Sequence, residues 1–179
     1  SKTWIHAAPT PGQVFEGLRE GRVFVSTGDL VTGLDMILAV DGEAREVWPG
    51  ETIRAARGAS VALTVSLVDP AAPNAAGGTP DFARLDVIVG RVTGPAMSRD
   101  NDVNRSTRVV ARYGRDDMNV SGEVLTARWE GVFEDNMYIR LRGTNTDEAE
   151  PVPDPKGEKP WNDLWFYSNP IFIEGGGEG

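Results

Sequence analysis

Two runs near the end of the chain decide the fold: YIRLRGTNT at residues 138–146 and WFYSNPIFI at residues 165–173. The first run alternates aromatic or charged residues with aliphatic ones, which is typical of a half-buried β-strand. The second run is extended except at Ser168–Pro170, where the proline cannot donate a hydrogen bond to a neighbouring strand and therefore favours a sheet edge or a β-bulge. We expect these runs to be the two closing strands of a β-rich domain.

The preceding segments also predict short strands joined by turns. Ser60–Val68 shows the strongest alternation, with aliphatic side chains on one face only. Leu34–Val40 precedes Asp41-Gly42, which favours a type I′ hairpin turn because both central residues of that turn need positive φ. Further strands are expected at Arg22–Ser26, near Ile53, at Leu85–Val89, at Thr107–Tyr113 and at Glu123–Phe133. About eight or nine strands at this spacing predict a mainly β fold, an antiparallel immunoglobulin-like or jelly-roll-like β-sandwich.

One short helix is expected near the start of the chain. Its capping signals are Thr10, Pro11, Gln13 and Gly21. Val14, Phe15 and Leu18 form a single narrow apolar stripe on this helix. Because a helix of about ten residues is marginal in water, we expect the stripe to pack against another surface.

The composition excludes several classes of protein. The formal net charge of -9 argues against a nucleic-acid partner, which would require a basic face. No apolar run approaches the roughly 18 residues that span a bilayer, so no membrane partner is expected either. The absence of cysteine excludes a disulfide framework and a thiolate zinc site. A chain of 179 residues is long enough for one well-filled core.

Charge is distributed unevenly along the chain. Residues 84–115 hold seven arginines against three aspartates, whereas residues 147–158 hold five acidic residues and one lysine. Two solvated surfaces are the more common explanation of such runs. The alternatives are that the two segments face each other or face a neighbouring domain.

Three parts of the chain resemble the C-terminal end of PHP-domain (polymerase and histidinol phosphatase) metal-dependent phosphoesterases. They are the opening KTWIH to LREGRVFVS (residues 2–26), the run at 138–146 and the run PWNDLWFYSNPI (residues 160–171). In that family a barrel-like metallohydrolase domain comes first, and some members continue into a β-sandwich. The resemblance implies that residues 1–30 are a helix–strand remnant of the catalytic domain, or its seam, and that residues 31–174 form the sandwich. A helix that covers one end of the sandwich is the alternative for the first segment, and residues 175–179 are expected to be a disordered tail.

The single histidine limits what chemistry the chain can perform. PHP-type phosphoesterases resemble other multi-metal hydrolases, which cluster several histidines and aspartates around their metal ions. A chain with only His6 cannot build such a site. We therefore expect no catalytic, cofactor-binding or metal-binding residue here, a structural role for His6, and divalent metals in the missing catalytic domain.

The function that the resemblance implies is that of a non-catalytic accessory domain. It would pack against the upstream catalytic domain of the same chain, or shape access to it, and the parent protein would be a hydrolase. The start at Ser1, without a methionine, suggests an excised fragment. The expected seam consists of the helix stripe together with Trp4 and Ile5, and its exposure predicts weak self-association.

Three other groups of residues have side chains that occur in functional sites. Asp100, Asp102 and Asn104 place oxygen ligands at alternate positions, as a calcium loop begins, but the glycine and glutamate that such a loop needs are replaced by Arg105 and Ala111. The acidic pairs Asp116-Asp117 and Asp147-Glu148 suit a solvated surface better than acid–base catalysis.

The alternative function is a stand-alone carbohydrate-binding β-sandwich. Trp48, Trp161, Trp165 and Tyr167 would provide its stacking platform. Trp165 and Tyr167 are expected on one strand face and Phe166 on the other. Packing in the core or at a seam is the more common role of such residues.

Overall fold

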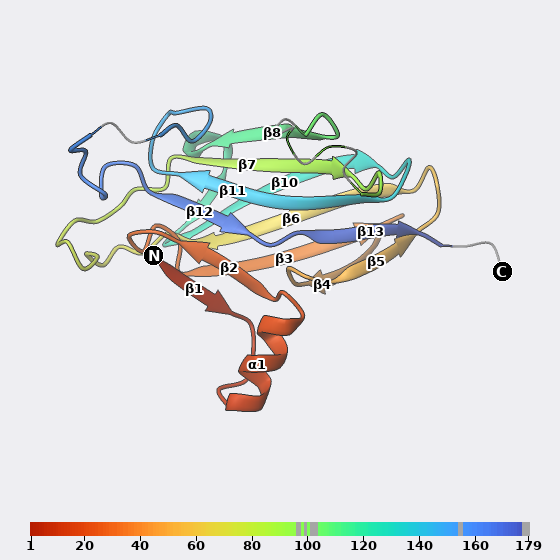
Figure 1. Ribbon diagram of the computed structural model, residues 1–179, viewed down its shortest axis with the longest axis horizontal. Helices are drawn as coiled ribbons and strands as arrows, with labels where there is room; N and C mark the ends of the chain where they lie inside the picture. The colour runs from red at the N-terminus through yellow and green to blue at the C-terminus, as the bar shows by residue number, and fades with distance from the viewer. Residues whose placement is uncertain (96–97, 99, 101–103, 154–155, 177–179) are drawn as a thin grey trace.

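The computed structural model describes residues 1–95, 98, 100, 104–153 and 156–176. In this part of the chain, two β-sheets stack on each other and one α-helix, α1 (Pro11–Arg19), precedes most of the strands. Figure 1 shows the two sheets one behind the other, with α1 projecting away from both. The predicted β-sandwich with one short N-terminal helix is confirmed.

The two sheets contain eight and five strands. The eight-stranded sheet comprises β1 (Lys2–Ile5), β2 (Val23–Ser26), β12 (Trp165–Ser168), β11 (Met137–Thr144), β13 (Ile171–Gly175) and β5 (Thr52–Ala55), with β7 (Arg84–Arg91) on the other side of β11 and β8 (Thr107–Gly114) beyond it. The five-stranded sheet has the order β4 (Glu43–Val47), β3 (Gly33–Val40), β6 (Ser60–Val68), β10 (Val124–Val132) and β9 (Asn119–Ser121). A short 3₁₀ helix, η1 (Arg115–Asp117), links β8 to β9.

The core lies between the inner faces of the two sheets. The apolar face predicted for β6 is fully buried, with Val61, Leu63, Val65 and Leu67 each at most 1% exposed. The three largest fully buried side chains are Phe82, Phe133 and Phe166. Burial of an aliphatic or phenylalanine side chain contributes about 1.5–3 kcal/mol to stability. Because the aliphatic residues of β6 all lie on one face, the strand is most stable with that face toward the core.

The hairpin between β3 and β4 has the predicted turn. Asp41 and Gly42 both have positive φ, at 49° and 88°. These angles match the two central residues of a type I′ turn, whose twist agrees with that of the flanking strands. The Asp41-Gly42 prediction is confirmed.

The second closing run is divided into two strands. β12 and β13 pair with different halves of β11, and the register between them contains one extra residue. At this bulge the Ser168 hydroxyl accepts the Leu141 N–H at 2.9 Å, in place of a backbone carbonyl. The break predicted at Pro170 is therefore confirmed. Beyond it, β13 pairs in parallel with β5, so the eight-stranded sheet is not purely antiparallel.

The N-terminal segment is joined to the sandwich by strand pairing. Thr10 caps α1, and its hydroxyl accepts the Gln13 N–H at 3.4 Å, as predicted. β1 and β2 flank the helix and pair with each other, and β2 also pairs with β12. Strand pairing therefore crosses the predicted boundary at residue 30. At the other end, β13 extends to Gly175 and the Gly176 N–H bonds to Ala55, while residues 177–179 lie outside the described part of the chain.

Candidate functional site

Helix α1 contacts the sandwich through its smallest residue. Gly17 is the buried residue of the helix. A Cβ atom at this position would lie 2.9 Å from Cγ2 of Ile5 and 3.1 Å from the carbonyl oxygen of His6. Real Cβ atoms rarely approach other atoms so closely, so glycine is what lets α1 lie directly on the end of β1.

The apolar stripe of α1 is consequently left uncovered. Phe15 is 68% exposed and Leu18 is 46% exposed, while Val14 is half-buried. The described residues of this chain therefore do not supply the surface that the stripe was expected to pack against. A rigidly held apolar helix face of this kind is typical of an interaction site.

The connection from α1 to β2 is held tightly by two turns of the sandwich. Gly50 has a φ of 89°, and a Cβ atom there would overlap the carbonyl of Glu20. The Asn169 side-chain amide donates to the Gly21 carbonyl at 3.1 Å, and the Asn169 backbone N–H donates to Val23 at 3.1 Å. These contacts fix the direction of α1 relative to both sheets.

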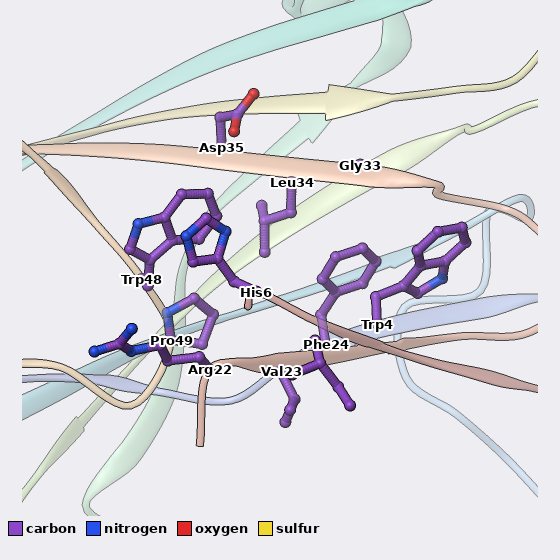
Figure 2. A pocket seen from close by; sticks show the side chains of 11 residues that line it. Trp4, His6, Arg22, Val23, Phe24, Gly33, Leu34, Asp35, Trp48 and Pro49 are labelled. Carbon is purple, nitrogen blue, oxygen red and sulfur yellow. The ribbon is translucent and has the colours of Figure 1, made fainter. Parts of the chain in front are cut away.

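An aromatic cavity lies beside this connection, between the edges of the two sheets. Its volume is about 240 Å³, and it is lined by residues of β1, β2, β3 and the turn after β4. Trp4 stacks on Phe24 with ring centroids 5.8 Å apart, and His6 stacks on Trp48 at 3.3 Å. Figure 2 shows these two aromatic pairs at opposite sides of the cavity.

Two side chains of this cavity contain buried donors without a protein acceptor. They are the indole Nε1 of Trp4 and the guanidinium Nε of Arg22. The terminal nitrogen of Arg22 is paired with Glu20 at 2.5 Å, so only part of its hydrogen-bonding capacity is used. Because an unsatisfied buried donor costs about 1–3 kcal/mol, these atoms mark a region whose polar groups are incompletely paired within the chain.

His6, for which a structural role is predicted, contacts neighbouring residues of this chain. Its ring packs on Trp48, and its backbone N–H donates to Arg22 at 2.9 Å. Within the described residues, no group of three or more histidine or acidic side chains is arranged to hold a metal ion.

A second polar cluster lies on the outer face of the eight-stranded sheet. Asp86 of β7 is fully buried. One of its oxygens accepts from Nε and Nη2 of Arg142 at 3.0 and 2.6 Å, and the other accepts from Nε of Arg84 at 2.9 Å. Arg112 of β8 lies 3.5 Å from the same carboxylate. A buried charge is tolerated when it is paired in this way.

The loop after β11 supplies a second carboxylate to this cluster. Glu150 accepts from Arg142 at 2.6 Å and from Arg112 at 2.9 Å. The Ala149 carbonyl accepts from Arg112 at 3.1 Å and from Arg142 at 3.2 Å, and the Glu148 carbonyl accepts from Arg84. The arginine-rich and acidic segments of the sequence thus face each other, which was the alternative to two solvated surfaces.

These contacts shift the pKa values of Arg142 and Glu150. Burial disfavours the charged form of Arg142, but hydrogen bonds to Glu150 and Asp86 outweigh burial and raise the Arg142 pKa. The hydrogen bond from Arg142, with smaller contributions from the charges of Arg142, Arg112 and Arg84, lowers the Glu150 pKa. Both shifts favour the charged forms of Arg142 and Glu150.

The aromatic residues considered for a glycan platform have different neighbours. Trp165 and Tyr167 share one strand face, as predicted, and their rings stack with centroids 6.1 Å apart. Trp165 is only 6% exposed, however, and Arg142 lies 5.6 Å from the centroid of its ring. Trp48 contacts His6, and Trp161 lines a separate cavity beside the loop before β12. A glycan platform stays a prediction.

The predicted calcium ligands and the acidic pair at 116–117 form local hydrogen bonds wherever the structure describes them. Asp102 lies outside the described residues, so the calcium prediction is not tested there. Asn104 accepts the Ser106 N–H at 3.0 Å. Asp117 accepts the Gly114 N–H at 2.9 Å and closes the turn of η1. These bonds are typical of turns.

Sequence reasoning placed Trp4 and Ile5 at a seam but did not foresee the cavity or the cluster around Asp86. A charged residue between Leu85 and Val87 was the available signal for the cluster, since it must lie on the face opposite the core. No protein-family model, curated protein or solved structure matches this chain. No helix in its described part is long and apolar enough to cross a membrane.

Proposed function

We propose that this chain is a non-catalytic accessory domain of a PHP-type metal-dependent phosphoesterase. In this proposal, α1 and the adjoining aromatic cavity form the surface that packs against the upstream catalytic domain of the same protein. The observation that supports it best is the exposure of Phe15 and Leu18 on a helix whose position is fixed.

The energetics of α1 favour a docking role. Burial of apolar surface contributes roughly 25 cal/mol per Å² to stability. Helix α1 gains little of this stabilisation within the chain, because the residue that it buries against the sandwich is Gly17, which has no side chain. The helix is already ordered by its Thr10 cap and by the contacts of the following turn. A partner would therefore bury Phe15 and Leu18 without first having to order the helix.

The aromatic cavity extends this surface. The rings of Trp4 and Trp48 offer apolar area in this cavity. An apolar side chain of the catalytic domain would complement these rings, and acceptor groups of that domain would pair with the buried donors of Trp4 and Arg22 after a rotation of those side chains. The parent's metal ions would belong to that catalytic domain, since a chain with one histidine lacks the imidazoles that a multi-metal phosphoesterase site uses.

Enzyme assays test the accessory role directly. The 179-residue chain, supplied with manganese or zinc, should hydrolyse no phosphoester, whereas protein made from the whole reading frame should hydrolyse one. Hydrolysis by the chain alone would overturn the proposal. A whole reading frame that encodes no histidine-rich metallohydrolase domain would overturn it as well.

A further inference from the structure

The arginines of the cluster around Asp86 pair with two carboxylates, Asp86 and Glu150, that differ greatly in their exposure to solvent. The Asp86 side chain is 1% exposed, whereas the Glu150 side chain is 59% exposed. Asp86 lies on a central strand, and Glu150 lies in the loop between β11 and β12. One carboxylate is thus a fixed part of the sheet, and the other reaches the arginines from solvent.

The hydrogen bonds of Glu150 are those of a bound oxyanion. One of its oxygens accepts from Nη2 of Arg112 and the other accepts from Nη1 of Arg142. A phosphate group accepts hydrogen bonds from paired guanidinium groups in the same way. We propose that Arg112 and Arg142 form a binding site for the phosphate group of a small molecule, and that Glu150 occupies this site from within the chain.

The charges of the cluster favour a dianion over a single carboxylate. Arg84, Arg112 and Arg142 are all paired with the one Asp86 carboxylate, so these four groups have an excess of two positive charges when Glu150 is withdrawn. Glu150 neutralises one of them. A phosphate dianion would neutralise both, on a protein whose overall charge is -9.

The arginines stay in place when the Glu150 side chain leaves. Arg142 is held by Asp86 from one side and lies over the Trp165 ring, 5.6 Å from its centroid. The loop itself is anchored by the backbone carbonyls of Glu148 and Ala149, which accept from the arginines independently of the Glu150 side chain. Exchange therefore needs only a side-chain rotation, which makes the site preorganised for a competing anion.

Removal of the internal competitor tests this proposal. Inorganic phosphate is titrated calorimetrically, at constant ionic strength and pH 7.5, into the wild type and Glu150→Gln. Phosphate should bind Glu150→Gln about tenfold more tightly, because the site is no longer occupied by its own carboxylate. Arg112→Gln introduced into that variant should abolish the gain. Glu130→Gln is the matched control, since Glu130 pairs with exposed Arg128 at 2.9 Å in the other sheet, and its phosphate affinity should equal that of the wild type.

The other outcomes overturn the proposal. Equal affinity of Glu150→Gln and the wild type would show that Glu150 occupies no anion site. Acetate binding as tightly as phosphate would show that the arginines do not favour a doubly charged anion over a single carboxylate. Methyl phosphate is titrated alongside inorganic phosphate, and binding of the free ion alone would exclude a phosphorylated small molecule.

A measurement on the wild type covers the case in which Glu150→Gln does not fold. Phosphate should shift the indole N–H resonance of Trp165, because Arg142 lies over that ring, and Arg112→Gln should remove the shift. No phosphate-dependent shift at concentrations up to tens of millimolar would also overturn the proposal. Neither result bears on the accessory role, because α1 does not take part in this site.

Discussion

Two regions of this molecule, the cluster around Asp86 and the surroundings of α1, differ in how far their buried polar groups are paired within the chain. Both carboxylate oxygens of Asp86 have an arginine partner. Around α1, the donors of Trp4 and Arg22 have no protein acceptor and Phe15 is exposed. The Asp86 carboxylate is thus fully paired within the chain, whereas the α1 region has the properties of a surface that another domain completes.

The difference follows from the cost of removing polar groups from water. A paired buried charge costs little more than an apolar replacement, but an unpaired one is strongly destabilising. The Asp86 cluster should therefore respond to substitution as part of the folding core. The α1 region should respond weakly in this chain alone and strongly in the presence of its partner.

The largest expected effect is that of Asp86→Asn. This change leaves Arg84 and Arg142 without their buried counter-ion and should lower the free energy of unfolding by about 3–5 kcal/mol. Urea denaturation measures this loss. Asp135→Asn is the control, because Asp135 pairs with Arg91 while its side chain is 42% exposed, and it should cost less than about 1 kcal/mol. Equal losses in the two variants would show that the buried Asp86 cluster contributes no more to folding than an exposed ion pair does.

The next effect concerns the turn that fixes α1. Gly50 and Gly42 both have φ near 90°, but only at Gly50 would an added Cβ overlap a backbone carbonyl, that of Glu20. Gly42→Ala should cost about 1–2 kcal/mol for the left-handed backbone alone. Gly50→Ala should cost more, and thermal unfolding of the two variants measures the difference. If their melting temperatures coincide, α1 is held less tightly than its contacts indicate.

A smaller effect is expected at the exposed helix face. Phe15→Ala should change the stability of this chain by less than about 0.5 kcal/mol, since Phe15 is 68% exposed. It should weaken binding to a separately produced catalytic domain by more than about 1 kcal/mol, a typical value for a buried aromatic contact. Calorimetric titration measures the affinity.

In the same titration with the catalytic domain, two substitutions to aspartate show whether an added surface charge weakens binding only at the α1 face. Leu18→Asp should also weaken binding, whereas Ile37→Asp should not, although the two residues are 46% and 47% exposed. Leu18→Asp should likewise remove any self-association seen by sedimentation. Equal effects of Leu18→Asp and Ile37→Asp would place the interface elsewhere.

The parts of the fold that sequence could predict are those encoded by local patterns. The alternation of β6, the Thr10 cap and the Asp41-Gly42 turn each depend on neighbouring residues, and each is confirmed. β4 and β9 were not predicted because they are short and mostly exposed, so they have little apolar signal. The closing run was predicted as one interrupted strand, whereas its bulge gives two strands with different neighbours.

The sites were less predictable because they join residues far apart in the chain. The stacking of His6 on Trp48 depends on two sheet edges meeting, and neither residue has a local pattern that indicates this. The charge complementarity of residues 84–115 and 147–158 was visible in the sequence. It could not indicate that Ala149 and Glu150 reach the arginines that hold Asp86, because such contacts depend on the path of the chain after β11.

The smallest effect is a pH dependence that separates the two carboxylates of the arginine cluster. Hydrogen bonding to Arg142 lowers the pKa of Glu150 in the folded chain, so Glu150 stabilises the fold above its ordinary pKa, and this contribution disappears as the pH falls through the lowered value. The Glu150 side chain is 59% exposed, so the contribution should be below about 1 kcal/mol. Urea denaturation of Glu150→Gln and the wild type should therefore give different unfolding free energies at pH 7, and the difference should shrink as the pH is lowered below the ordinary pKa of glutamate. A difference that does not shrink with falling pH would mean that Glu150 acts through packing of the loop, and its carboxylate would then not be the exchangeable part of the cluster.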